Sequence, residues 1–231
     1  FRSGSLARIR INASNGNLLN PSGTVAAVND RIQTFIDRGS LAINGTQTVS
    51  GNQPQLQQVS GQNVIAIDAT RGDHWNFPDN SLDSNFAAGG EVFIVEAVAS
   101  VGVASGHWAI SGAGSADYYT FGGAIYDSCG STVRRDAISP GSVDLTQFNI
   151  YSVRSAPGEH TFRLNGNVIA TYATNTVKWQ DTAAERPIRV GVSRDLQTGT
   201  RSVKEFIVTN LLTDPQRTAL IAELKALHGI A

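Results

Sequence analysis

The residues best suited to chemistry lie in one short segment, residues 71–75, which reads RGDHW. A carboxylate, an imidazole and an indole follow one another there, at Asp73, His74 and Trp75. Sugar sites combine an aromatic platform with a few fixed polar groups, so this loop is a candidate glycan site. The alternative is that Trp75 belongs to the core, which we favour because tryptophan is mostly buried. The Arg-Gly-Asp tripeptide is too short to indicate integrin binding.

Two adjacent tyrosines form a second candidate surface, Tyr118 and Tyr119, just after Asp117. Tyrosine gives a large contact area at a small entropic cost, although strand alternation would place one of the two in the core. The candidate ligand-binding residues are therefore Asp73, His74, Trp75, Tyr118 and Tyr119.

Carboxylates that could cleave a glycosidic bond are not placed as pairs. Two catalytic carboxylates on one strand face need an even spacing, and Glu91 and Glu96 are five residues apart. Glu159 and His160 are neighbours and also face opposite ways. The sequence thus predicts no catalytic residues and no enzyme. A polysaccharide-degrading enzyme, acting through Glu96 or Glu159, stays as the alternative. The simpler interpretation of Glu96 is a buried carboxylate bonded to a neighbour.

The sequence also contains no residue pattern typical of a metal or cofactor site. Cys129 is the single cysteine and no activating base adjoins it, so we expect an inert thiol. No two histidines have the spacing of a helical zinc motif, and Asp73, Asp79 and Asp83 lack the regular spacing of a calcium loop. We predict no metal and no cofactor.

Charge and hydropathy exclude two classes of partner. Eighteen basic and 19 acidic residues give a net charge of −1, without the clustered positive surface that nucleic acid requires. No run of 18 apolar residues occurs, so we expect no membrane insertion. The chain begins at Phe1 and contains no methionine, which favours processing from a longer polypeptide.

Strand-like segments separated by glycine-rich turns must position these residues. The clearest are 91–99, 63–68, 148–153 and 188–193. The first is apolar on both faces and is therefore predicted to be a central strand. In the last, Ile188, Val190 and Val192 are expected to point inward, while Arg189 and Ser193 are expected to face solvent. The strongest local pattern is 160–172, where Asn165-Gly166 between two apolar runs predicts a type I′ hairpin.

One helix is expected, over about 213–228. Thr213 and Gln216 form a capping box, and Gly229 ends the helix. Leu220, Ile221, Leu224 and Leu227 form one apolar stripe, which we expect to pack on the rest of the protein. The polar segment 39–62 is expected to form long surface loops.

The order of several loose motifs resembles the concanavalin A-like, laminin-G-like jelly-roll domains of bacteriophage structural and bacterial surface proteins. The stretches that carry the resemblance are Val28–Arg31, Phe35–Gly39, Asn52–Leu56, Val64–Asp68, Tyr151–Arg154 with Phe162–Gly166, Arg189–Gly191, Val203–Val208 and Leu212–Arg217. Phe35 stands where the family has tryptophan, and the glycine expected after Asp68 is missing, which weakens the transfer of a binding site.

The resemblance implies an all-β fold, a two-sheet antiparallel jelly-roll sandwich with one C-terminal helix, forming a single domain over 1–231. It implies a non-catalytic virion or cell-surface module that contacts glycans or neighbouring subunits, located on a virion or outside the cell. A purely architectural capsid decoration or fibre domain, in a homo-oligomer, is a further alternative. A fold by itself names no ligand.

Overall fold

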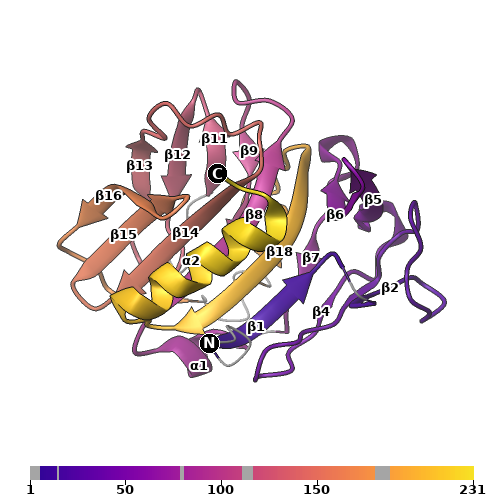
Figure 1. Cartoon of the computed structure of the whole chain (residues 1–231), viewed down its shortest axis with the longest axis horizontal. Coiled ribbons are helices and arrows are strands. Elements are labelled where there is room, and N and C mark those ends of the chain that lie inside the picture. The colour runs from indigo at the N-terminus through magenta and orange to yellow at the C-terminus, as the bar shows by residue number, and fades with distance from the viewer. Residues whose placement is uncertain (1–5, 15, 79–80, 111–116, 180–187) are drawn as a thin grey trace.

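The structure is a computed structural model that describes residues 6–14, 16–78, 81–110, 117–179 and 188–231. Three antiparallel sheets make up most of it, and one long helix lies across the largest sheet (Figure 1). The predicted mostly-β architecture with a C-terminal helix is confirmed. The finer prediction of a two-sheet jelly roll is not established by these sheets.

The largest sheet, sheet A, has eight strands. They are β1 (Ala7–Asn12), β5 (Gln55–Val59), β6 (Gln62–Ile67), β8 (Gly90–Val98), β14 (Asn149–Ala156), β15 (Glu159–Leu164), β16 (Asn167–Tyr172) and β18 (Arg201–Asn210). Their order is β16-β15-β14-β8-β18-β6-β5, and β1 also pairs with β18. The two longest strands, β8 and β18, therefore lie at the centre.

Two smaller sheets complete the framework. Sheet B contains β2 (Leu18–Leu19), β3 (Thr34–Phe35), β4 (Gly45–Thr46), β7 (Trp75–Asn76), β10 (Trp108–Ala109) and β17 (Arg189–Val190). Sheet C contains β9 (Ser105–Gly106), β11 (Tyr118–Phe121), β12 (Ala124–Asp127) and β13 (Arg135–Ile138). The helices are α1 (Asp83–Phe86), α2 (Asp214–His228) and the 3-10 turns η2 (Ser50–Asn52) and η3 (Ala69–Arg71). In the described part of the chain, none of them has the length and hydropathy of a membrane span.

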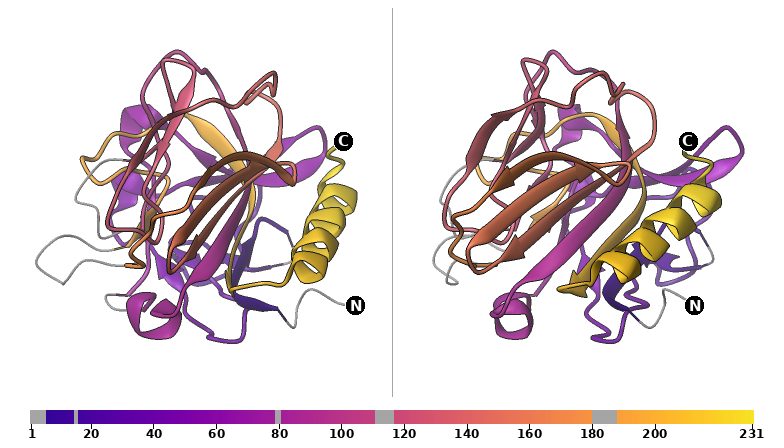
Figure 2. Two further views of the ribbon diagram at one scale, coloured as in Figure 1. Left: turned by 90° about the vertical axis from the view of Figure 1, so that its left-hand side faces the viewer. Right: turned by 60° about the vertical axis from the view of Figure 1, so that its left-hand side comes forward.

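Sheet A separates two apolar cores, as the two-sided pattern of 91–99 predicted. From β8, Val92 and Ile94 enter the larger core, which sheets B and C share, whereas Phe93 and Val95 enter the smaller core beneath α2. We call the first face of sheet A inner and the second outer. In Figure 2, α2 lies on one side of sheet A and the strands of sheet C on the other.

The hairpin and the helix form as their local sequence dictates. Asn165 and Gly166 have φ angles of 51° and 90°, as a type I′ turn requires. Thr213 caps α2 with its side chain, Gln216 completes the capping box, and Gly229 adopts the left-handed conformation after the last turn. One detail differs from the prediction, because Leu227 is 50 % exposed and outside the buried stripe.

Thr213→Ala is expected to lower the free energy of unfolding by about 1 kcal/mol, since it removes the acceptor for the Gln216 amide at the start of α2. The measurement is urea unfolding of both proteins. Thr218→Ala, at an exposed position within the same helix, is the control and should not destabilise. Equal stability of Thr213→Ala and the parent protein would contradict the capping role.

Two sequence predictions are wrong in detail. Segment 39–62 is not all loop, since it contains β4 and β5, and β5 is the edge strand of sheet A. Strand β5 is rich in glutamine and only its Leu56 is buried, so the sequence shows no apolar alternation there. In 188–193 only β17 is a named strand; Ile188, Val190 and Val192 are buried as predicted, but Ser193, expected to face solvent, is buried too.

A register shift in β18 decides which side chains reach the outer face. Pairing with β8 slips between Val203 and Glu205, leaving Lys204 as an extra residue. Val203 and Phe206 both enter the inner core although they are three residues apart. The bulge therefore presents two consecutive residues, Lys204 and Glu205, on the outer face.

Candidate functional site

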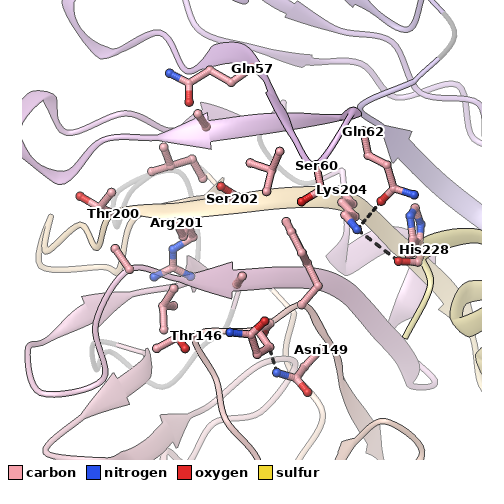
Figure 3. A pocket seen from close by; sticks show the side chains of 18 of the residues that line it. Gln57, Ser60, Gln62, Thr146, Asn149, Thr200, Arg201, Ser202, Lys204 and His228 are labelled. Atoms are coloured by element: carbon pink, nitrogen blue, oxygen red, sulfur yellow. Dashed lines mark hydrogen bonds between the residues drawn. The ribbon is translucent and has the colours of Figure 1, made fainter. Parts of the chain in front are cut away.

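A pocket of about 940 Å³ lies on the outer face of sheet A, beside the C-terminal end of α2 (Figure 3). Amide and hydroxyl side chains from four separate parts of the chain surround it. They are Gln57, Ser60 and Gln62 from β5, β6 and their turn, Thr146, Gln147 and Asn149 from the start of β14 and the loop before it, Asn165 from the turn between β15 and β16, and Thr200 and Ser202 from β18 and its approach. We call this the outer pocket.

The pocket exists because α2 covers only part of the outer face. Leu220, Ile221 and Leu224 of the helix cover the large apolar residues in the first part of β8. Further along β8 the outer-face residue is small, Ala97, and its partner on β18 is Ser202. Small side chains beyond the reach of the helix leave a recess with a polar rim.

Two carboxylates line the outer pocket, Asp68 and Asp144. Asp68 follows the end of β6 and Asp144 lies in the loop before β14, and three strand spacings, about 14 Å, separate β6 from β14 in sheet A. Hydrogen bonds from Thr70 lower the pKa of Asp68, and those from Thr146 lower the pKa of Asp144. Both are therefore ionised at neutral pH, which suits a base or a nucleophile and not a proton donor.

A second set of ionisable residues is buried on the inner face, between sheets A and C. Arg201 Nη1 lies 2.9 Å from Glu96 Oε2, and His107 Nδ1 lies 2.9 Å from Glu96 Oε1. All three residues are at most 2 % exposed. Although burial acts to raise the pKa of Glu96, the charges of His107 and Arg201 lower it overall. Glu96 is thus a buried, paired carboxylate, as the simpler interpretation predicted.

Two further carboxyls, Asp117 and Asp127, continue this buried cluster. Asp127 accepts hydrogen bonds from Tyr151 Oη at 2.7 Å and Trp108 Nε1 at 3.3 Å, while Asp117 accepts from the Ser128 amide at 2.8 Å. Burial raises the pKa of both, and in Asp117 the charge of Asp127 raises it further. A pair of acids with raised pKa values resembles a catalytic arrangement, but neither side chain is accessible to a substrate.

The predicted loop site is mainly a packing element. Trp75 is fully buried, stacks on Phe35 at 4.8 Å and packs against Gly45, where an added Cβ would lie 2.6 Å from its ring. Asp73 is buried and ion-paired with Arg71, so the carboxylate of the Arg-Gly-Asp tripeptide is not presented to a partner. The core interpretation of Trp75 is confirmed.

His74 is also held inside this loop. Its Nδ1 hydrogen-bonds the Gly72 carbonyl at 2.8 Å, and its Nε2 contacts the Gln47 amide at 2.9 Å. Burial lowers the pKa of His74, so the ring is neutral at pH 7, with Nε2 accepting from Gln47. None of the three loop residues lines the outer pocket.

The predicted tyrosine pair is divided between surface and core. Tyr118 is partly exposed and donates a hydrogen bond to Asp195 at 2.8 Å, whereas Tyr119 is fully buried and stacks on His107. Neither lines the outer pocket, so the structure does not bring the two predicted sites together. Ligand binding by these five residues stays a prediction.

The remaining chemical candidates are also placed. Glu159 pairs with Arg154 at 3.2 Å and lies outside the outer pocket. Cys129 is buried, and burial raises the pKa of its thiol, which leaves it unreactive as expected. Asp79 lies outside the described residues. Over the described ranges, no three His, Cys, Asp or Glu side chains gather in a way that would hold a metal ion.

Sequence reasoning missed the outer pocket entirely. Its lining comes from Asn165 and from segments 57–62, 66–71, 97–99, 144–149, 200–204 and 228–231, and no single motif joins them. The usable signal is weak: an unusual run of polar side chains, Gln57, Gln58 and Gln62, flanking a turn that joins two strands.

Comparison with known proteins reveals similarity of fold alone. No family model and no curated protein matches this sequence. Among solved structures, Trypanosoma rangeli sialidase in complex with the inhibitor DANA matches with a TM-score of 0.60 at 12 % identity, over 92 % of this chain and 32 % of the sialidase. A GH54 arabinofuranosidase complexed with arabinofuranosyl-alpha-1,2-xylobiose matches with a TM-score of 0.61 at 11 % identity, over 95 % of this chain and 61 % of that chain. This chain thus spans a third to three fifths of their lengths.

These matches correct the function predicted from sequence. The two solved structures named above are glycoside hydrolases, not phage or laminin-G proteins, and they overturn the prediction of a non-catalytic module that contacts glycans or subunits. They equally overturn the prediction that the chain is not an enzyme. The β-sandwich part of the resemblance fits them, and they favour the polysaccharide-degrading alternative. Catalytic carboxyl groups can also converge from different strands, which the spacing along one strand does not test.

Proposed function

We propose that this chain acts in polysaccharide degradation as a glycoside hydrolase on a β-sandwich framework, and that the glycan lies in the outer pocket. The observation that carries the proposal is the pocket itself. Its volume of about 940 Å³ and its rim of amides and hydroxyls suit a short stretch of sugar units, whose hydroxyl groups need many donors and acceptors. The glycoside hydrolases of similar fold support the same class of substrate.

Hydrolysis adds water across the glycosidic bond and requires one group that activates water or attacks carbon, and one that protonates the leaving oxygen. The ionised carboxylates of Asp68 and Asp144 suit the first role. Among the described residues of the outer pocket, no carboxyl has a raised pKa that would suit the second. We therefore propose Asp68 and Asp144 for the ionised role only.

The test is release of reducing ends from a panel of neutral and acidic polysaccharides. We expect Ser202→Trp to abolish release, because an indole beside Ala97 would fill the recess without entering either core. Val168→Trp, at an exposed position on β16 of the same sheet, is the matched control and should retain the parent rate. Asp68→Asn or Asp144→Asn should lower the rate by about 100-fold or more if that carboxylate acts as the base.

Two results would count against the proposal: a parent protein that releases no reducing ends from any substrate, or a Ser202→Trp variant as active as the parent. The finer fold, a concanavalin A-like jelly roll in one domain over 1–231, stays part of the proposal, supported by the two layers that sheet A forms with sheets B and C. An extracellular or cell-surface location is also proposed, because polymeric glycans occur there.

A further inference from the structure

Lys204 is a buried cation whose described partners are all uncharged. The residue is 5 % exposed, and its ammonium donates to Gln62 Oε1 at 2.5 Å and to the His228 carbonyl at 3.2 Å. In the part of the chain that the structure describes, no carboxylate forms an ion pair with it. An ammonium held away from water without a counter-charge is costly, so the site is ready for an anion.

The β18 bulge brings this cation to the place where a ligand would lie. Lys204 lines both the outer pocket and an adjoining cavity of about 330 Å³, and Gln62 and His228 are the other residues that the two share (Figure 3). Its ammonium lies 3.9 Å from the centre of the Phe148 ring, which also lines the outer pocket. An aromatic face beside a cation offers a surface for a sugar ring and a charge for its substituent.

The two cavities that continue the outer pocket differ from it in their lining, because the outer pocket itself contains Asp68 and Asp144. The 330 Å³ cavity shares Ser14 and Leu227 with a third cavity of about 410 Å³, to which Arg10 and Arg38 contribute. No aspartate or glutamate is among the described residues that line either cavity. Arg10 is already paired with Glu205, whereas the Arg38 guanidinium donates to the neutral Asn17 side chain.

We propose that Lys204 binds an anionic substituent of the glycan, a carboxylate or a sulfate, so that the substrates of the outer pocket are acidic polysaccharides. This inference rests on the proposed function, because it takes a glycan as the occupant of the pocket. The side chain of Gln62 is exposed and accepts from Lys204 through a neutral amide oxygen. An anion attracts the ammonium more strongly than a neutral amide oxygen does, because both partners are then charged, and it takes the place of Gln62. Burial also lowers the pKa of Lys204, and a bound anion would oppose that effect.

The test compares matched pairs of polymers that differ only in charge. Binding of the full chain is measured by calorimetry with polygalacturonate and its methyl ester, and with dextran sulfate and dextran. At low salt we expect at least one acidic polymer to bind about tenfold or more tightly than its neutral partner, and added salt to reduce that ratio. Carboxylate and sulfate are distinguished by which pair shows the preference.

Substitutions then assign the preference to one residue. Lys204→Met should bring the acidic polymer to the affinity of the neutral one, and Lys204→Arg should keep most of the preference. Lys225→Met removes the same charge from α2 outside the three cavities and should leave the ratio unchanged. A purely structural role, in which Lys204 only holds the end of α2, would lower the melting temperature and leave the ratio as it is.

The outcomes separate this inference from the proposed function. If neutral and acidic polymers bind alike, or if Lys204→Met keeps the preference of the parent, the anion site is wrong even where reducing ends are released. If a Lys204-dependent preference is found without any hydrolysis, the anion site stands and the hydrolase proposal fails. If Lys204→Met does not fold, the proposal is still tested by the ratio of acidic to neutral affinity in the parent protein, by the salt dependence of that ratio, and by the ratio in Lys204→Arg.

Discussion

Glu91→Gln is expected to lower the free energy of unfolding by about 3–5 kcal/mol, because it removes the buried carboxylate of an ion-pair network and leaves Arg217 and Arg154 with only the more exposed Asp214 and Glu159 as counter-charges. Glu91 Oε2 lies 2.6 Å from Arg217 Nε, and Oε1 lies 2.7 Å from Arg154 Nη1 and 2.9 Å from the Leu212 amide. One carboxylate thus joins β8, β14 and the start of α2. Its hydrogen bonds and its charge raise the pKa of Arg217, which stays protonated and in the variant would keep only the exposed Asp214 as a counter-charge.

Urea unfolding of the parent and the variant measures this loss. Glu223→Gln is the matched control: it removes the same charge from a half-exposed position on α2, 3.6 Å from Arg10, where an ion pair contributes about 0–1 kcal/mol. A loss at Glu91 no larger than at Glu223 would contradict the anchoring role. If α2 detached before the sheets unfolded, urea unfolding would show two transitions. We expect one transition, because Glu91 joins the start of α2 directly to β8 and β14.

The parts of the fold that the sequence predicts well are those with a local physical cause. Asn165-Gly166 selects its turn because both residues accept positive φ, and Thr213 with Gln216 starts α2 because the two side chains satisfy the first free amides. The segment 91–99 was expected to be central because both of its faces are apolar. Each of these features is decided within a few residues of the chain.

The site could not be predicted because its causes are not local. The outer pocket joins segments as distant in the sequence as 57–62 and 200–204, and it is hollow because α2 ends before covering Ala97. Alternation along β18 would place Lys204 and Glu205 on opposite faces, and only the bulge places both on one face. The burial of Trp75 was expected from the general preference of tryptophan, whereas the space that receives its indole depends on Gly45 and Phe35 in other strands.

The buried acids on the inner face give a second large expected effect, a change in how stability depends on pH. Asp117 is fully buried beside Asp127, and both burial and the neighbouring charge raise its pKa well above the usual value. Below about pH 4 this carboxyl is protonated in the folded and in the unfolded chain. As the pH rises further, the unfolded chain loses the proton first, so its free energy falls relative to the folded protein. Stability therefore decreases by about 1.4 kcal/mol per pH unit until the folded pKa is reached.

Asp117→Asn should remove this contribution while keeping the local geometry, because the amide oxygen can still accept from the Ser128 amide and hydroxyl. We expect the variant to gain stability relative to the parent between pH 4 and 7, measured by urea unfolding at each pH. Asp30→Asn is a control of opposite sign: hydrogen bonds from the Ala27 amide and Asn20 lower the pKa of Asp30, so its contribution is present above pH 4 and lost in acid. A difference between the parent and Asp117→Asn that stays constant with pH would mean that Asp117 titrates alike in both states. It would then not be the acid that the inner cluster holds protonated.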